Sequence, residues 1–95
     1  MQSYQFTKKD HRKQGCTVIR CGEHMAVIYK HNGGWSYRVG FFGESEIIPV
    51  RQYSFNGGCS TKSAAIVQAE ASIVGHGPNG RDYLDVSIEY VKGVK

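Results

Sequence analysis

The sequence predicts an α+β fold, with an antiparallel sheet of four to five strands and one helix packed on one face. Short segments rich in β-branched and aromatic residues alternate between apolar and polar side chains, as half-buried strands do. Glycine-rich turns separate these segments, since the chain holds 12 glycines but only two prolines. One segment alone has its apolar residues at helical spacing. A chain of 95 residues supports one small core.

The first predicted strands are residues 17–21 and 25–30, with Gly22-Glu23 between them. The sequence His31-Asn32-Gly33-Gly34 then predicts a hairpin turn, because Asn and Gly tolerate the positive φ that such turns require. The next strand is half-buried, and its apolar positions are Trp35, Tyr37, Val39 and Phe41.

A further strand is predicted over residues 46–55, ending at Asn56-Gly57-Gly58. Pro49 lacks an amide hydrogen, which favours an edge position or a bulge. The last strand follows Asn79-Gly80, and its inward side chains are Leu84, Val86, Ile88 and Tyr90. With one helix on one face, the other face of the sheet is expected to be open.

The helix is predicted over residues 62–74, after the N-cap pair Ser60-Thr61. Gly75, Gly77 and Pro78 end it. Its core side chains are expected to be Ile66, Val67, Ala69, Ile73 and Val74.

Positive charge is concentrated at the N-terminus. Residues 1–15 contain four basic residues and one acidic residue, Asp10, and are interpreted as a basic arm preceding a single domain over residues 16–95. The basic residues of the arm are Lys8, Lys9, Arg12 and Lys13. Such an arm can contact phosphates, although a solvated tail that keeps the protein soluble is an equally good interpretation.

Membrane insertion, secretion and metal binding are not expected. No apolar run is long enough to span a bilayer, and no hydrophobic signal segment opens the chain. Three cysteines, an odd number, are typical of free thiols in the cytoplasm. His11, Cys16, Cys21 and His24 are close in sequence and raise the possibility of zinc. Cys16 and Cys21 are an odd number of residues apart, however, and therefore point to opposite faces of a strand.

No enzyme activity and no cofactor are predicted. Cys59 precedes the helix, where backbone amides could hold an anion, but the surrounding residues do not form a P-loop. An ordinary capped turn accounts for this segment. The four histidines and eight carboxylates show no spacing that indicates an acid/base pair.

Residues 28–73 resemble the arm-type DNA-binding domain of tyrosine recombinases, the phage integrases. The resemblance rests on four segments: Ile28-Tyr29-Lys30, Asn32-Gly33-Gly34-Trp35, Tyr37-Arg38-Val39 and Thr61-Lys62-Ser63-Ala64-Ala65. It implies a three-stranded sheet that lies in the DNA major groove. In its size and expected make-up the chain is also similar to small phage inhibitors of bacterial defence, including anti-CRISPR proteins.

Two functions follow from these observations. The preferred one is a phage-type interaction protein that binds a protein of nucleic-acid metabolism or host defence. A sheet face that binds nucleic acid should be basic, whereas here four acidic residues interrupt the positive charge of the sheet: Glu44, Glu46, Asp85 and Glu89. Its predicted interface residues are Tyr37, Phe42, Tyr53 and Tyr83. The alternative is a direct DNA- or RNA-binding module, with Arg38 and Arg51 joining the four basic residues of the arm. The sequence equally allows these aromatic side chains to be covered by loops or by a second copy of the chain.

Overall fold

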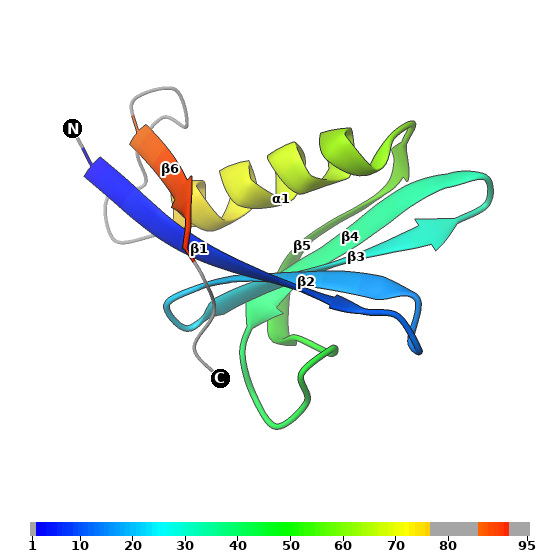
Figure 1. Ribbon diagram of the computed structural model, residues 1–95, viewed down its shortest axis with the longest axis horizontal. Coiled ribbons are helices and arrows are strands. Elements are labelled where there is room, and N and C mark those ends of the chain that lie inside the picture. Colours follow the sequence, from blue (N-terminus) through cyan, green and yellow to red (C-terminus); the bar gives the residue numbers. More distant parts are fainter. Residues whose placement is uncertain (1, 77–85, 92–95) are drawn as a thin grey trace.

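The structure, a computed structural model, describes residues 2–76 and 86–91 (Figure 1). Its elements are β1 (Gln2–His11), β2 (Cys16–Cys21), β3 (His24–His31), β4 (Gly34–Phe41), β5 (Val50–Cys59), α1 (Lys62–His76) and β6 (Val86–Tyr90). The strands form one sheet in the order β5-β4-β3-β2-β1-β6, in which only β1 and β6 are parallel. α1 lies across one face, over β3, β4 and β5. The predicted α+β class is confirmed, with a six-stranded mixed sheet.

The basic N-terminal segment differs from the arm that its composition suggested. Residues 2–11 form β1, which pairs with β2 on one side and with β6 on the other. Tyr4 and Phe6 point to the helix side, where Phe6 is fully buried and Tyr4 packs against the same core. Burial of Phe6 offers far more stabilisation than leaving this segment in solvent, so the segment joins the sheet.

The hairpin between β3 and β4 forms as predicted. His31 pairs with Gly34, and Asn32 and Gly33 have φ values of 50° and 78°. These positive values are the reason for Asn and Gly at the two central positions of the turn.

The strand predicted over residues 46–55 is β5, which begins later than predicted, at Val50, and ends later, at Cys59. Residues 42–49 form a loop, because the Ser45 hydroxyl accepts hydrogen bonds from the amides of Ile47 and Ile48, both at 3.1 Å. β5 then continues through the glycines to Cys59, which pairs with Trp35. β5 is an edge strand, and its register against β4 shifts twice. Pro49, which stands just before the strand, was expected to favour an edge position or a bulge.

The helix packs through a face slightly different from the predicted one. Ala65, Ala69, Ile73 and Val74 are buried in the main core, and Ile66 packs against it. The prediction that Val67 belongs to this core is wrong, because its side chain is 48% exposed. Spacings of four from Ala65 define the buried stripe, and position 67 lies on the opposite side of the helix.

Substitutions in α1 test this assignment. Ile73→Ala is expected to lower the free energy of unfolding by about 2 to 4 kcal/mol, through lost burial and the cavity left behind. Val67→Ala, the matched control, is expected to change it by less than about 0.5 kcal/mol. Chemical denaturation followed by circular dichroism measures both. Equal losses from the two variants would contradict the helix orientation.

The last predicted strand is described only in part. Ile88 packs against the core as expected. The Tyr90 hydroxyl donates a 2.5 Å hydrogen bond to the buried carboxylate of Glu70, while the Tyr90 residue remains 40% exposed. Leu84 lies outside the described residues, and of Val86 only the backbone is described.

The face of the sheet opposite α1 is partly covered. Val18, Met25 and Val27 on this face are at most 6% exposed, and Ile47 from the loop 42–49 packs against them. Figure 1 shows this loop, in green, on the side of the sheet away from α1. We call this side the loop face. The expectation of a fully open face is therefore wrong, because these apolar strand residues are buried more favourably under the loop than in water.

Candidate functional site

Cationic and aromatic side chains share the loop face with the buried apolar residues. Residues paired directly across neighbouring strands point to the same side of a sheet. One row across β1 to β5 is Lys9, Val18, Val27, Arg38 and Phe55. The flanking rows are Thr7, Arg20, Met25 and Gly40 on one side, and His11, Cys16, Tyr29 and Ser36 on the other.

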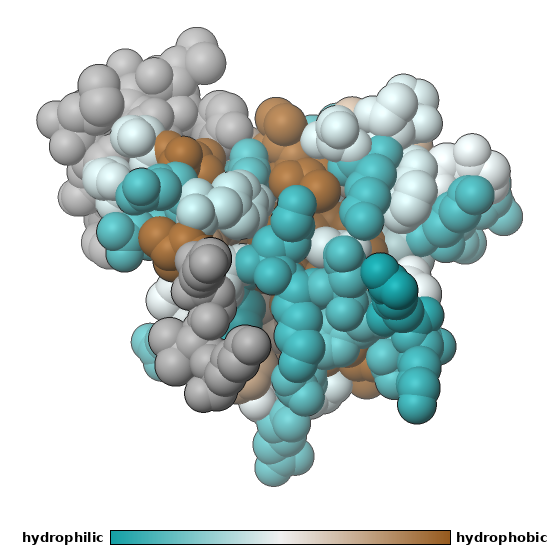
Figure 2. Space-filling view, viewed as in Figure 1, coloured by the Kyte–Doolittle hydropathy of each residue, from teal (hydrophilic) through white to brown (hydrophobic). Residues whose placement is uncertain are grey.

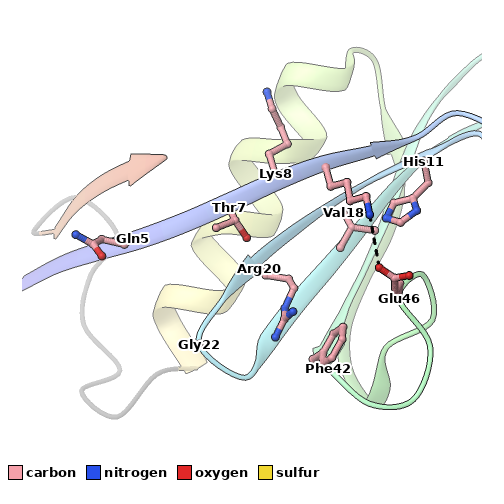
Figure 3. Close-up of a pocket in the computed structure, with 10 residues that line it drawn as sticks. Gln5, Thr7, Lys8, His11, Val18, Arg20, Gly22, Phe42 and Glu46 are labelled. Carbon is pink, nitrogen blue, oxygen red and sulfur yellow. Dashed lines mark ion pairs between the residues drawn. The ribbon is translucent and has the colours of Figure 1, made fainter. Parts of the chain in front are cut away.

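The first hollow of the loop face is a groove of about 410 Å³ between β1, β2 and the loop 42–49 (Figure 3). The guanidinium of Arg20 stacks on the Phe42 ring, 3.6 Å from its centroid, and its buried Nε has no hydrogen-bond partner. Lys9 forms a 3.7 Å ion pair with Glu46, and both side chains are about two-thirds exposed. A pair so exposed contributes little to stability, so an anionic ligand can displace Glu46 at small cost.

The second hollow, of about 320 Å³, lies on the other side of the same loop. Its walls are Tyr29 and Arg38 from the strands and Ile47, Ile48 and Pro49 from the loop, and residues 14–16 close one end. The Arg38 guanidinium lies 5.5 Å from the centroid of the Tyr29 ring. Phe55, the β5 partner of Arg38, is 73% exposed beside it. The hollow thus combines an apolar wall, an aromatic ring and a positive charge.

Acidic side chains are absent from the loop face of β1 to β5. The only acidic residue in these strands is Asp10, which follows Lys9 and therefore points to the helix side. There its carboxylate accepts a 2.7 Å hydrogen bond from the Thr17 hydroxyl. This hydrogen bond lowers the pKa of the Asp10 carboxyl, and the positive charges of Lys62, Lys8 and Arg12 lower it by smaller amounts. Glu46, expected on a strand, lies together with Glu44 in the loop 42–49.

The structure separates the six predicted nucleic-acid contacts. Lys9 and Arg38 lie in one row of the loop face. Lys8 points to the helix side, with its Nζ 5.7 Å from the Tyr90 ring centroid. The remaining three are exposed residues outside the rows: Arg12 and Lys13 in the turn after β1, and Arg51 at a φ of 52° in β5. Figure 2 shows hydrophilic residues gathered near the end of β1 and its turn.

The described aromatics of the predicted protein interface differ in exposure. Tyr37 is 6% exposed and packs under α1, because it shares the parity of the core residue Val39. Burial raises the pKa of Tyr53 to about 12, and its hydroxyl hydrogen-bonds His24 Nδ1 at 2.9 Å. Phe42 is 36% exposed beneath Arg20. Tyr83 lies outside the described residues. The prediction that Tyr37 is an interface residue is therefore wrong.

The cysteines carry no sign of an activated nucleophile. All three are unpaired, and Cys16 and Cys21 lie on opposite faces as predicted. Burial raises the pKa of both thiols, although a backbone hydrogen bond from Gln5 partly offsets this at Cys21. A raised pKa reduces the thiolate that attacks substrates or binds metals. Within residues 2–76 and 86–91, no three His, Cys, Asp or Glu side chains gather as metal ligands would.

The start of the helix is capped in the ordinary way. Thr61 Oγ1 accepts a 3.1 Å hydrogen bond from the amide of Ala64. Cys59, just before it, is 4% exposed in the core. The described part of the chain has no helix long and apolar enough to cross a membrane.

Sequence reasoning missed Arg20, and it did not single out Tyr29 and Phe55 as contacts. The alternation of Cys16, Val18 and Arg20 placed Arg20 on the same face as a buried valine, and this signal was available. The pairing of Phe55 with Arg38 depends on the register of β5 against β4, which shifts twice.

Comparisons with protein-family models, with curated proteins and with solved structures found no match for this chain.

Proposed function

We propose that this chain is a non-enzymatic nucleic-acid-binding module that uses the loop face. The observation that carries the proposal is the placement of Lys9, Arg20 and Arg38 on one sheet face whose strands β1 to β5 contribute no acidic side chain. Cations grouped on one surface attract the phosphate backbone and release its counterions. Acidic residues were the reason to prefer a protein partner. Glu44 and Glu46 belong to the loop, where Glu46 pairs with Lys9, and Glu89, the β6 partner of Gln5, points to the loop face only at the far edge of the sheet. Asp85 lies outside the described residues.

The position of Arg20 supports the same function. Arg20 lines the first hollow, and a guanidinium is well suited to a phosphate oxygen. Arg20 is already held in place by its stacking on Phe42, so little side-chain freedom is lost when an anion binds.

A salt series tests the proposal. Fluorescence anisotropy of a labelled oligonucleotide is expected to show binding at low salt that weakens linearly on a log–log plot. If the three cations of the loop face each meet a phosphate, the slope is about −2 on a single strand and about −3 on a duplex. Absence of binding to any DNA or RNA at low salt would refute the proposal.

A second candidate is the phage-type inhibitor of a protein of nucleic-acid metabolism or host defence. Exposed apolar side chains at the β5 edge favour it: Ile48 is 59% exposed, Val50 43% and Phe55 73%. Such a strip, next to an unpaired strand edge, is typical of protein interfaces. Failure of the salt series, together with capture of one specific protein partner that Phe55→Ala releases, would favour this candidate.

A further inference from the structure

We infer that the nucleic acid bound by the loop face is single-stranded DNA or RNA, with a base stacked at the second hollow against Tyr29, Arg38 and Phe55. This inference rests on the proposed function and adds its substrate class. Three features of the face support it: the obstruction at its centre, the chemistry of the hollow and the position of its charges.

The loop 42–49 obstructs the centre of the face. Val18, Met25 and Val27 are buried beneath it, so the middle of β2 and β3 offers no side chain to a base edge. A sheet that reads a duplex must enter the major groove with exposed side chains on its central strands. The resemblance to arm-type domains implied such a geometry, and the covered centre does not allow it. A flexible single strand can follow the hollows on either side of the loop.

The second hollow has the chemistry of a base-stacking surface. Bases stack on aromatic rings and on guanidinium planes without regard to sequence, because every base has a π face. Tyr29 is partly buried and therefore held in place, with Arg38 beside its ring. Ile48 and Pro49 supply an opposing apolar wall. Phe55, 73% exposed next to Arg38, extends the surface to the adjacent strand.

The charges lie where the backbone of a stacked strand would run. Lys9 and Arg38 stand three strands apart in one row, which is a span of roughly 14 Å at the usual strand spacing. The two cations therefore flank the covered centre from opposite sides. A single strand whose base occupies the second hollow places its phosphates beside Arg38 and can continue toward the groove of Lys9 and Arg20.

The test compares four probes of equal length by anisotropy: a mixed-sequence single strand of DNA, the same sequence as RNA, the matching DNA duplex, and an abasic single strand. We expect both base-containing single strands to bind about ten-fold or more tightly than the duplex and the abasic strand. Equal or tighter binding of the duplex, or equal binding of the abasic strand, would overturn the inference while leaving the proposed function in place. Binding of none of the four would refute the proposed function.

Variants locate the stacked base. Phe55→Ala removes an exposed ring and is expected to weaken single-strand binding by about ten-fold without changing the salt slope. Tyr29→Leu keeps an apolar side chain in the hollow and is expected to have a similar effect. Val67→Ala, which removes exposed apolar surface from the far side of the molecule, is the control and is expected to bind as the parent does. Unchanged binding by both ring variants, with their folds intact, would contradict the stacking site.

Discussion

Replacing Phe6 by alanine is expected to lower the free energy of unfolding by about 3 to 5 kcal/mol. The Phe6 side chain is fully buried and belongs to the main core, and its ring contacts the tilted ring of Tyr90 at 5.6 Å between centroids. Its removal leaves a cavity between β1, β6 and the helix side of the sheet. Urea denaturation followed by circular dichroism measures the loss.

Gln5→Ala is the matched control, because Gln5 precedes Phe6 in the same strand and its side chain is exposed. We expect it to change the free energy of unfolding by less than about 0.5 kcal/mol. If Phe6→Ala does not fold at all, Phe6→Leu is expected to fold with a smaller loss, since most of the buried volume is kept. An unchanged denaturation midpoint for Phe6→Ala would mean that residues 1–15 are an arm after all.

The parts of the fold that local patterns determine could be predicted. The turn at Asn32-Gly33 needs a positive φ that few other residues adopt, and the cap at Thr61 needs a side-chain acceptor. Both signals lie within a few residues of the structure that they specify. The class of the fold followed from them, and so did the hairpin and the helix.

The N-terminal strand could not be predicted in the same way. Tyr4 and Phe6 are only two apolar residues, and the basic residues after them dominate the composition. Their burial depends on β6, which pairs in parallel from the other end of the chain. Such distant pairing leaves no short-range mark in the sequence.

Of the three cations of the candidate site, the sequence analysis named two, Lys9 and Arg38, and missed Arg20. The aromatic assignment failed at Tyr37 because its side of β4 lies under α1, and alternation alone did not show which face the helix covers and which lies toward the loop 42–49. The position of that loop depends on Ser45 and on contacts with Val18 and Val27 from other strands. These contacts are tertiary and carry no periodic signal.

The loop face as the nucleic-acid surface is the central claim, and neighbouring lysines allow a matched test of it. Lys8 and Lys9 are adjacent in β1 but point to opposite sides of the sheet. The variant Lys9→Gln with Arg38→Gln removes two charges from the loop face. The variant Lys8→Gln with Lys62→Gln removes two positive charges from the helix side, where Lys62 Nζ lies 3.8 Å from Asp10 Oδ1.

The decisive measurement is the affinity of both double variants for a labelled single strand across a salt series. The loop-face variant is expected to bind at least about ten-fold more weakly at low salt than the parent, with a slope shallower by about 1.4. The helix-side variant is expected to keep the parent slope and most of the affinity. Equal losses in the two variants, or a larger loss on the helix side, would contradict the assignment of the loop face as the binding surface.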